Sequence, residues 1–586
     1  MPKTLKPVDA VTIGVGWTGG IIARELTKAG LRVVGLERGD FRNTNPDFLA
    51  PGVHDELAYI SRNKLFQDPA RDTMTFRNAA RETALPIRQF TAFLPGDGLG
   101  GGSVHWTGRT WRFLEYDFTL RSSSIAKYGA AVMGDDCTSR DWGITYHDLE
   151  PDYDRFEYLA GISGKAGNLN GKKIAGANVF EAPRKREYPN PPMKPSYSQE
   201  LFRTAAAGLG LHPFIAPSAN VTQTYKNPEG VTMGACAYCG FCDRFSCEMS
   251  AKSSVQTTLL PVLLKDPNYE LRTNAHVLKI ELDASGKRAT GVTYLDANGI
   301  ETFQPAEMVF VTAFQLNNVH LLLVSGIGKP YDPATATGTL GKNYAYQAAG
   351  GMTLYFEDKH FNPFMGAGGL TMGIDDYNGD NFDHSGLGFI GGGVTAQSTS
   401  SGRPIAYHPV PPGTPRWGAA WKAAAAKQYN STFSVACDGS NQSYRGNHLD
   451  LDPTYTNAYG QPLLRITFDW GSHERGFWNW VRPKFDAIAK ALGPKSYNFD
   501  PIRPTFGLAG YQSTHNTGGA IMGTDPTQSA VNTYQQSWDV PNVFSVGASS
   551  FPQNAGYNPT GTVGALAYRT AEAVVKRYIK SPGPLA

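Results

Sequence analysis

A glycine-rich turn near the N-terminus limits the folds open to this chain more than any other feature. The apolar residues 8–13 predict a buried strand, and the run G-V-G-W-T-G follows directly at residues 14–19. We expect a helix over residues 21–29 and a second strand over residues 31–36, which ends at Glu37. A strand, a glycine-rich turn, a helix and a second strand in this order form a βαβ unit of an α/β fold.

This unit predicts a dinucleotide site. Gly14 allows a tight turn, Gly16 lets the backbone approach a pyrophosphate, and Gly19 allows close packing of helix on strand. The N-terminus of the helix offers N–H groups to the phosphates, and Glu37 is placed to accept a hydrogen bond from a ribose hydroxyl. FAD and NAD both fit this motif.

Composition and length exclude several classes of protein. The chain has 586 residues, too many for one hydrophobic core, so we expect two or more domains. Its 54 Lys and Arg and 51 Asp and Glu residues give a net charge of only +3, which argues against a nucleic-acid scaffold. No apolar run approaches the ~20 residues of a membrane-spanning helix. Residues 1–7 contain no apolar signal core and no twin arginine, so we expect any export to depend on a partner.

The rest of the chain predicts two kinds of domain. Helices are expected over residues 145–159, 198–209, 317–324 and 562–579, and strands over residues 269–282, 289–294, 308–311 and 543–546. Residues 346–480 contain short strands between Gly, Asp and Asn turns, with a helix-prone stretch at 417–428. This pattern indicates an antiparallel sheet that covers a pocket.

The fold class we predict is α/β (α+β overall), with a Rossmann-like dinucleotide domain interrupted by an antiparallel-sheet substrate domain. The dinucleotide domain is expected to comprise residues 1–115, 226–345 and 500–586, and the substrate-binding or cap domain residues 116–225 and 346–499.

Four of the six cysteines are clustered in one loop, residues 234–250. They are Cys236, Cys239, Cys242 and Cys247, with the spacing C-x2-C-x2-C-x4-C. Thiols this close cannot crosslink distant parts of the chain, so they predict a metal or cluster site. The spacing is near that of ferredoxins and favours an iron–sulfur cluster over the alternative, a zinc ion. Cys137 and Cys437 are expected to be packed thiols.

Three further polar residues lie in glycine-rich loops. His105 lies in G-G-G-S-V-H-W-T at residues 100–107, where a cofactor ligand and a hydrogen-bonded core residue are both open interpretations. His515 follows Thr514 ahead of a glycine pair, and Asn558 lies in G-Y-N-P-T-G at residues 556–561. Histidine is suited to accept a proton near neutral pH, and an Asn amide can orient a hydroxyl. We therefore take His515 as the candidate general base.

These motifs together resemble the GMC (glucose–methanol–choline) flavin oxidoreductases over nearly the whole chain. The resemblance depends on Gly14-x-Gly16-x-x-Gly19, Ser325-Gly326-Ile327-Gly328, the His515 loop and Asn558-Pro559-Thr560 ahead of the last helix. More narrowly, residues 343–347, 443–447, 468–470, 519–526 and 536–540 resemble the flavoprotein subunits of bacterial membrane-bound gluconate 2-dehydrogenases. One departure is Asn317-Asn318, where the GMC signature favours Ser/Thr-Pro.

The resemblance implies FAD rather than NAD, held in a domain of the GMC and pyranose-oxidase type. It implies that His515 takes the proton of the substrate hydroxyl while hydride passes to the flavin, with Asn558 at the partner position, and that His105 links FAD covalently. The FAD contacts expected besides His105 are Gly14, Gly16, Gly19, Glu37, Gly101, Gly102, Val277, Gly547, Ala548, Asn558, Pro559 and Thr560.

The resemblance also implies an electron path and partners. A [3Fe–4S] cluster is favoured, for which the spacing selects Cys236, Cys242 and Cys247, and a [4Fe–4S] cluster on all four cysteines stays open. The implied partners are a multihaem cytochrome c subunit, which passes electrons to quinone, and a small subunit that carries the export signal. The implied location is the periplasmic face of the bacterial inner membrane.

The implied reaction is oxidation of D-gluconate to 2-dehydro-D-gluconate with an acceptor other than oxygen. Alternatives are related dehydrogenases of 2-ketogluconate, fructose, glucose, sorbitol or a glucoside at C3, and an oxygen-using pyranose oxidase. An alternative of another class is a flavin-containing electron-transfer or assembly subunit without substrate chemistry. Arg445 is a candidate partner for a substrate carboxylate, and the alternative is that it bonds to backbone in a turn.

Overall fold

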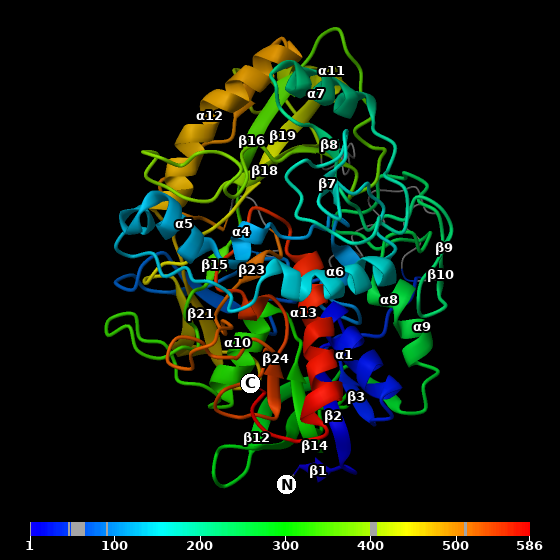
Figure 1. Cartoon of the computed structure of the whole chain (residues 1–586), viewed down its shortest axis with the longest axis vertical. Helices are drawn as coiled ribbons and strands as arrows, with labels where there is room; N and C mark the ends of the chain where they lie inside the picture. The colour runs from blue at the N-terminus through cyan, green and yellow to red at the C-terminus, as the bar shows by residue number, and fades with distance from the viewer. Residues whose placement is uncertain are drawn as a thin grey trace.

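Two large β-sheets, one toward each end of the long axis, organise the molecule (Figure 1). The computed structural model describes residues 2–44, 47, 65–89, 92–398, 407–508 and 513–585. Helices α1 (Trp17–Lys28) and α13 (Thr560–Ala573) lie beside the lower sheet in this view. Helices α7 (Tyr197–Gly208) and α12 (Ser472–Leu492) lie at the upper end.

The lower sheet has eight strands and contains the predicted βαβ unit. Its strands are β1 (Lys3–Thr4), β2 (Val8–Ile13), β3 (Val33–Leu36), β11 (Tyr269–Arg272), β12 (His276–Leu282), β13 (Ala289–Leu295), β14 (Glu301–Val311) and β24 (Val543–Ser545). The order is β11-β3-β2-β14-β13-β12, with β1 and β24 also paired to β14. Strands β11, β3, β2, β14 and β24 run parallel, so their carboxyl ends meet at one edge, where such sheets bind ligands.

Alternate residues of the central strands face two separate cores. Ala10 and Phe310 pack with α1 and α13 on one face of the sheet. Val11 and Val309 pack on the other face with α10 (Gln315–Val324). This period of two explains why consecutive residues such as Val309 and Phe310 are both apolar, because both faces of the sheet are covered.

The upper sheet has six antiparallel strands. They are β8 (Phe214–Ile215), β16 (Ala348–Tyr355), β17 (Thr371–Ile374), β18 (Gly393–Ser398), β19 (Thr432–Gly439) and β22 (Ser496–Phe499), in the order β22-β16-β19-β18-β17-β8. Leu354 and Cys437 share an apolar core with Phe477 and Phe485 of α12. Cys437 is thus a packed thiol, as predicted, and Cys137 is buried in another apolar cluster.

A third sheet joins distant parts of the chain. It pairs β20 (His448–Thr456) and β21 (Pro462–Thr467) with β4 (Met74–Arg77) and β5 (Leu85–Pro86). Strands β4 and β21 are parallel neighbours, although they are almost 400 positions apart in the sequence. This sheet therefore crosses from the segment 1–115 to the segment 346–499, which the sequence assigned to different domains.

The smaller elements connect these sheets. The short strands are β6 (Asn168–Leu169), β7 (Lys172–Lys173), β9 (Tyr225–Lys226), β10 (Thr232–Met233), β15 (Ala345–Tyr346) and β23 (Asn516–Thr517). The further helices are α3 (Gly102–His105), α4 (Glu115–Phe118), α5 (Leu120–Tyr128), α6 (Tyr146–Ala160), α8 (Val255–Thr258), α9 (Leu260–Leu263) and α11 (Ala419–Gln428).

Most predicted elements are present, and several differ in their bounds; strand β14, for example, begins at Glu301 and not at residue 308. Helix α1 begins at Trp17, directly after the glycine turn, and not at residue 21. The strand expected over residues 269–282 is two strands, because Asn274 adopts a left-handed conformation (φ +52°) that turns the chain between β11 and β12. Helix α12 was not predicted, since Gly476 and Pro483 interrupt its pattern.

No helix in the described ranges combines the length and apolar character that a bilayer span demands.

Candidate functional site

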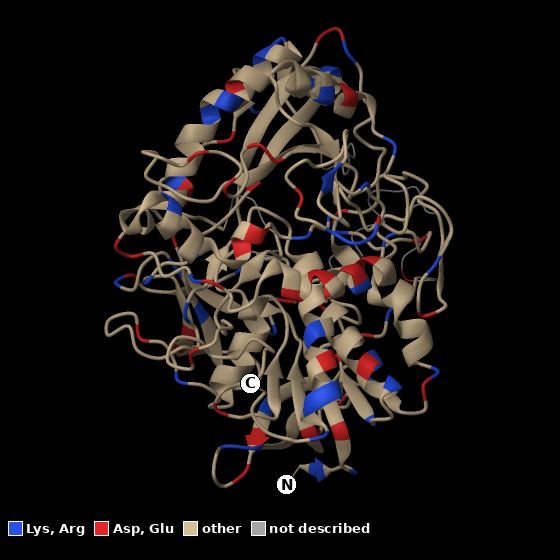
Figure 2. Ribbon diagram, in the orientation of Figure 1, with Lys and Arg blue, Asp and Glu red and all other residues tan. Residues whose placement is uncertain are grey.

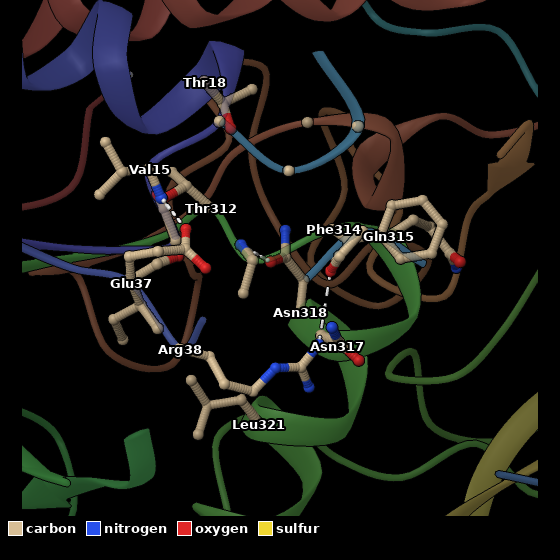
Figure 3. A pocket seen from close by; sticks show the side chains of 18 of the residues that line it. Val15, Thr18, Glu37, Arg38, Thr312, Phe314, Gln315, Asn317, Asn318 and Leu321 are labelled. Carbon is tan, nitrogen blue, oxygen red and sulfur yellow. Dashed lines mark hydrogen bonds between the residues drawn. The ribbon is translucent and has the colours of Figure 1, made fainter. Parts of the chain in front are cut away.

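A cavity opens at the carboxyl ends of β2 and β14, beside the first turn of α1 (Figure 3). Glu37, which follows β3, lines this cavity, and its carboxylate accepts hydrogen bonds from the N–H groups of Val15 (3.0 Å) and Gly39 (3.2 Å). Burial raises the pKa of Glu37 to about 7, and the two N–H donors oppose that rise. The carboxyl group is therefore held at the cavity with lone pairs left for a ribose hydroxyl.

The backbone around the cavity leaves room for a bound dinucleotide. The N-cap of α1 is Gly16, which has no side chain to cap the first N–H groups, so these can bind a phosphate. Gly101 and Gly102 also line the cavity, and a Cβ on either would meet nothing within 4 Å. A ligand can therefore lie directly against this backbone.

The structure brings most of the predicted cofactor residues to this one cavity. Those that line it are Gly14, Gly16, Glu37, Gly101, Gly102, Val277, Gly547, Ala548, Pro559 and Thr560. Gly19 does not line it, but a Cβ there would lie 2.0 Å from the carbonyl oxygen of Gly14, which is the close helix–turn packing expected of this glycine. His105 and Asn558 also lie outside the lining.

His515 and Asn558 meet beside this cavity. Asn558 Nδ2 lies 3.4 Å from His515 Nε2, and the residues next to each of them, Thr514 and Pro559, line the cavity. Trp111 Nε1 donates to Asn558 Oδ1 at 2.8 Å. This bond fixes the orientation of the Asn558 amide, so that its N–H groups face His515.

Gln347 fixes the protonation of His515, a role that sequence reasoning missed. The Gln347 amide donates through Nε2 to the carbonyls of Tyr557 (3.1 Å) and Ala555 (3.5 Å), so Oε1 faces the imidazole. His515 Nδ1 bonds to this Oε1. Because an amide oxygen only accepts, Nδ1 carries the proton and Nε2 keeps its lone pair.

The electrostatic environment keeps His515 neutral. Burial lowers the pKa of His515 to about 4, Asp438 opposes this shift, and Arg109 adds to it. Arg109 Nη1 donates to Asp438 Oδ2 at 3.4 Å, so the two neighbouring charges form a pair. An unprotonated Nε2 at neutral pH is what a general base requires.

His105 is buried at the end of α3, between two residues, Ser103 and Trp106, that line the cavity. Its ring packs against Phe66, with ring centroids 4.7 Å apart. His105 Nε2 has no hydrogen-bond partner among the described residues. Burial lowers the pKa of His105 to about 3, and Lys252 and Arg244 lower it further. The imidazole is thus neutral, and one of its buried nitrogens is without a partner in the part of the chain that the structure describes.

The cysteine loop packs against the His105 segment. The N–H of Arg244 donates to the carbonyl of His105 at 2.9 Å. The buried ammonium of Lys252 donates to the carbonyls of Trp106 (2.6 Å), Cys242 (2.7 Å) and Phe245 (2.6 Å). One side chain therefore ties the cysteine loop to the wall of the cavity.

The donor chemistry of this loop suits a thiolate-bound group. N–H donors lie near these sulfurs: the Tyr238 backbone near Cys236 (3.4 Å), the Lys252 backbone near Cys247 (3.3 Å) and the Asn220 amide near Cys242 (3.6 Å). Within the described ranges, however, no three His, Cys, Asp or Glu side chains are grouped to hold a metal ion. The loop thus has the donors for a metal centre but not the arrangement of a single-ion site.

Two residues singled out in the sequence have structural contacts. The guanidinium of Arg445 is exposed and donates to the carbonyls of Pro333 (2.8 Å) and Ala334 (2.7 Å), so it bonds to backbone in a turn and does not face the cavity. Asn318 is buried in α10 and donates to the carbonyl of Val546 at 3.2 Å. The departure from the Ser/Thr-Pro signature thus ties α10 to the segment after β24.

Comparison with known proteins agrees with this geometry. Two models of the family described as GMC oxidoreductase match residues 200–349 and 443–567. The chain is 48% identical to the gluconate 2-dehydrogenase flavoprotein of Pantoea cypripedii, over 99% of this chain and 95% of that protein. It is 24% identical to the fructose dehydrogenase large subunit of Gluconobacter japonicus, over 97% of each.

The fold also matches a solved structure. Pyridoxine 4-oxidase from Mesorbium loti superposes with a TM-score of 0.59 at 16% identity, covering 96% of this chain and 98% of that chain. The predicted mixed α/β fold class is confirmed. Together with the glycine turn, the Glu37 cavity and the 48% identity, these matches establish that the chain belongs to the GMC oxidoreductase family.

Proposed function

We propose that this oxidoreductase oxidises the C2 hydroxyl of D-gluconate to give 2-dehydro-D-gluconate. The observation that carries the proposal is the His515–Asn558 pair beside the dinucleotide cavity, with Nε2 of His515 left unprotonated. The 48% identity to a gluconate 2-dehydrogenase flavoprotein supports the choice of substrate. In this oxidation the C2 hydroxyl loses its proton to a base, and C2 loses a hydride to a cofactor.

Membership of the GMC family implies FAD, and the cavity fits it. Glu37 would bind a ribose hydroxyl, and the first turn of α1 would bind the pyrophosphate. When bound, FAD supplies the two-electron acceptor for the hydride. His515 accepts the hydroxyl proton at Nε2, and the Asn558 amide orients that hydroxyl.

The experiment that tests this function is anaerobic mixing of the FAD-loaded protein with aldonates, polyols and sugars. We expect gluconate to bleach the flavin absorbance fastest, and His515→Ala to slow bleaching by roughly 10²–10⁴-fold with FAD still bound. Faster bleaching by 2-ketogluconate, fructose, glucose, sorbitol or a glucoside would reassign the substrate. Rapid reoxidation by oxygen would favour a pyranose oxidase, and a flavin that none of these compounds reduces would indicate an electron-transfer subunit without substrate chemistry.

His105 is proposed as the covalent link to FAD. Its buried Nε2 without a described partner, one residue from the cavity wall, supports the assignment. After denaturation, the flavin should stay attached to the unmutated protein and be released from the His105→Ala variant. Flavin that is released from the unmutated protein would remove the link.

The cysteine loop is proposed to bind an iron–sulfur cluster, [3Fe–4S] on Cys236, Cys242 and Cys247, or [4Fe–4S] with Cys239 as well. The spacing and the N–H donors near three sulfurs support the proposal. A bound cluster would supply one-electron transfer. Iron and acid-labile sulfide in the purified protein are the expected result, and zinc without sulfide would contradict it.

A cytochrome c partner, a signal-bearing small subunit and a periplasmic location at the inner membrane are proposed together. The likeness to a gluconate 2-dehydrogenase flavoprotein, and to a fructose dehydrogenase protein that is itself named as a large subunit, supports them. Co-purification of a haem-containing subunit with the periplasmic membrane fraction would support them.

The proposed FAD-binding segments are 1–115, 226–345 and 500–586, and the proposed cap segments are 116–225 and 346–499.

A further inference from the structure

A second cavity lies beside the upper sheet. It is bounded by the start of β16, by α12 and by the residues that follow β22. Its walls include the aromatic side chains of Trp470, Trp478 and Phe506, and Gln347 also lines it. A cavity with aromatic walls and a few polar groups is the usual form of a small-molecule site.

This cavity reaches the candidate catalytic pair. Gln347 lines the cavity and bonds through Oε1 to His515. Ala349, another lining residue, is the register partner of Asp438 on β19, whose carboxylate binds Arg109 near His515. A molecule in the second cavity is therefore in contact with residues that touch the catalytic histidine or its charged neighbours.

Among the described residues, two of the three arginines that line this cavity have no anionic partner. Arg475 donates to the carbonyl of Trp470 at 3.0 Å and lies 3.7 Å from Asp469. Arg482 and Arg503 are exposed, and within the described ranges neither makes a hydrogen bond or an ion pair. The guanidinium of Arg482 lies 4.8 Å from the ring centroid of Phe499.

The acidic residues of the cavity do not neutralise these two charges. Glu474 is buried and accepts hydrogen bonds from the N–H of Gln442 (2.7 Å), the N–H of Gly471 (2.9 Å) and the hydroxyl of Tyr444 (2.8 Å). Asp500 is the other acid in the lining; burial raises its pKa, and its carboxylate already accepts a hydrogen bond from the Gly351 backbone. Among the described residues, Arg482 and Arg503 thus line the cavity without an ion pair to either acid. Figure 2 shows that Lys and Arg also predominate along the exposed side of α12.

This combination matches a polyhydroxy carboxylate. A guanidinium fork binds a carboxylate, the lone pairs that remain on a carboxylate such as Asp500 accept hydroxyl groups, and aromatic faces pack against the C–H groups of a sugar chain. We infer that the second cavity admits anionic sugars to the His515 site, and that Arg482 and Arg503 select them by their carboxylate. The inference rests on the proposed function and adds the residues that choose an aldonate over a neutral polyol.

The test compares an anionic with a neutral substrate. In the FAD-loaded protein, the double variant Arg482→Gln, Arg503→Gln should lower kcat/KM for gluconate by roughly tenfold to hundredfold and leave kcat/KM for sorbitol unchanged. Salt should weaken turnover of gluconate by the native protein but not by the variant. Lys484→Gln is the matched control, because it removes a positive charge from α12 at a residue that does not line the cavity. An equal loss for both substrates, or an equal effect of the control, would overturn the inference.

A binding measurement separates this inference from the proposed reaction. Trp470 and Trp478 line the cavity, so gluconate binding can be followed by tryptophan fluorescence without turnover. The expected Kd rises in the double variant by the same factor as kcat/KM falls. If gluconate binds but is not oxidised, the reaction assignment fails while the cavity assignment stands. If gluconate does not bind, or binds the variant equally well, the cavity assignment fails whatever is oxidised.

Discussion

Replacement of Gln347 by leucine is expected to slow proton abstraction by His515 without displacing either the substrate or FAD. Leucine has a similar size, but it cannot accept the hydrogen bond from Nδ1. The imidazole can then move its proton to Nε2, the atom that must receive the substrate proton. Asn558 opposes this change only weakly, because its amide nitrogen lies 3.4 Å from Nε2.

The size of the effect follows from the lost hydrogen bond. A buried donor without a partner costs about 1–3 kcal/mol, and 1.4 kcal/mol corresponds to a factor of ten. The productive tautomer of Gln347→Leu should therefore be populated roughly 5- to 150-fold less. We expect the rate of flavin reduction at saturating substrate to fall by that factor, with KM nearly unchanged.

Anaerobic stopped-flow measurement of flavin absorbance gives this rate directly. Gln347→Glu is the control, since it keeps an acceptor for Nδ1 and adds a negative charge that raises the pKa of His515. The control should retain most of the rate at high pH, with its acid limb moved to higher pH. If Gln347→Leu reduces flavin at the native rate, the tautomer argument is wrong.

Three further predictions concern the same regions. The kcat/KM of the native enzyme should stay level from pH 7 down to about 5 and fall tenfold per unit below about 4, because burial lowers the pKa of His515 to about 4 and only the neutral form accepts a proton. Gly19→Ala should lower the free energy of unfolding by about 1–3 kcal/mol and weaken FAD binding, since its Cβ would lie 2.0 Å from the Gly14 carbonyl oxygen. In protein from which any iron has been removed, Lys252→Met should expose the Cys242 thiol to reagents, because three carbonyls lose their donor.

Each of these predictions has a control and an opposing outcome. An acid limb near pH 6.5 would show that His515 is not the base. Gly208→Ala, at a helix position where a Cβ meets nothing within 4 Å, should not destabilise the protein, and an equal loss there would remove the steric argument for Gly19. A Cys242 thiol that is equally protected in Lys252→Met would show that the ammonium does not hold the loop.

The βαβ unit could be predicted because its determinants are local. The glycine spacing, the apolar strands and Glu37 lie within 30 residues, and both the turn and the acid lie at one cavity. His515 and Asn558 were also identified by their loops. The two residues are 43 positions apart in the sequence, and only the folded structure shows that Asn558 Nδ2 lies 3.4 Å from His515 Nε2.

The contributions of Gln347 and Arg482 could not be predicted in the same way. Gln347 is 168 positions from His515, and nothing in the sequence around it indicates a polar contact. Arg482 lies on α12. A glycine and a proline interrupt the helical pattern of this segment, so the sequence did not indicate a helix there. Arg445, the arginine chosen from the sequence, bonds to backbone instead, because the sequence could not distinguish a turn from a binding site.

The proposed oxidation of gluconate is tested most directly by the rate of flavin reduction. Gluconate deuterated at C2 is mixed anaerobically with the FAD-loaded enzyme. If the C2 hydrogen leaves as hydride while His515 takes the hydroxyl proton, gluconate must bleach the flavin, and deuterium must slow that bleaching. An oxidised flavin that persists with gluconate, or bleaching at the same rate with either isotope, would contradict hydride transfer from C2 of gluconate.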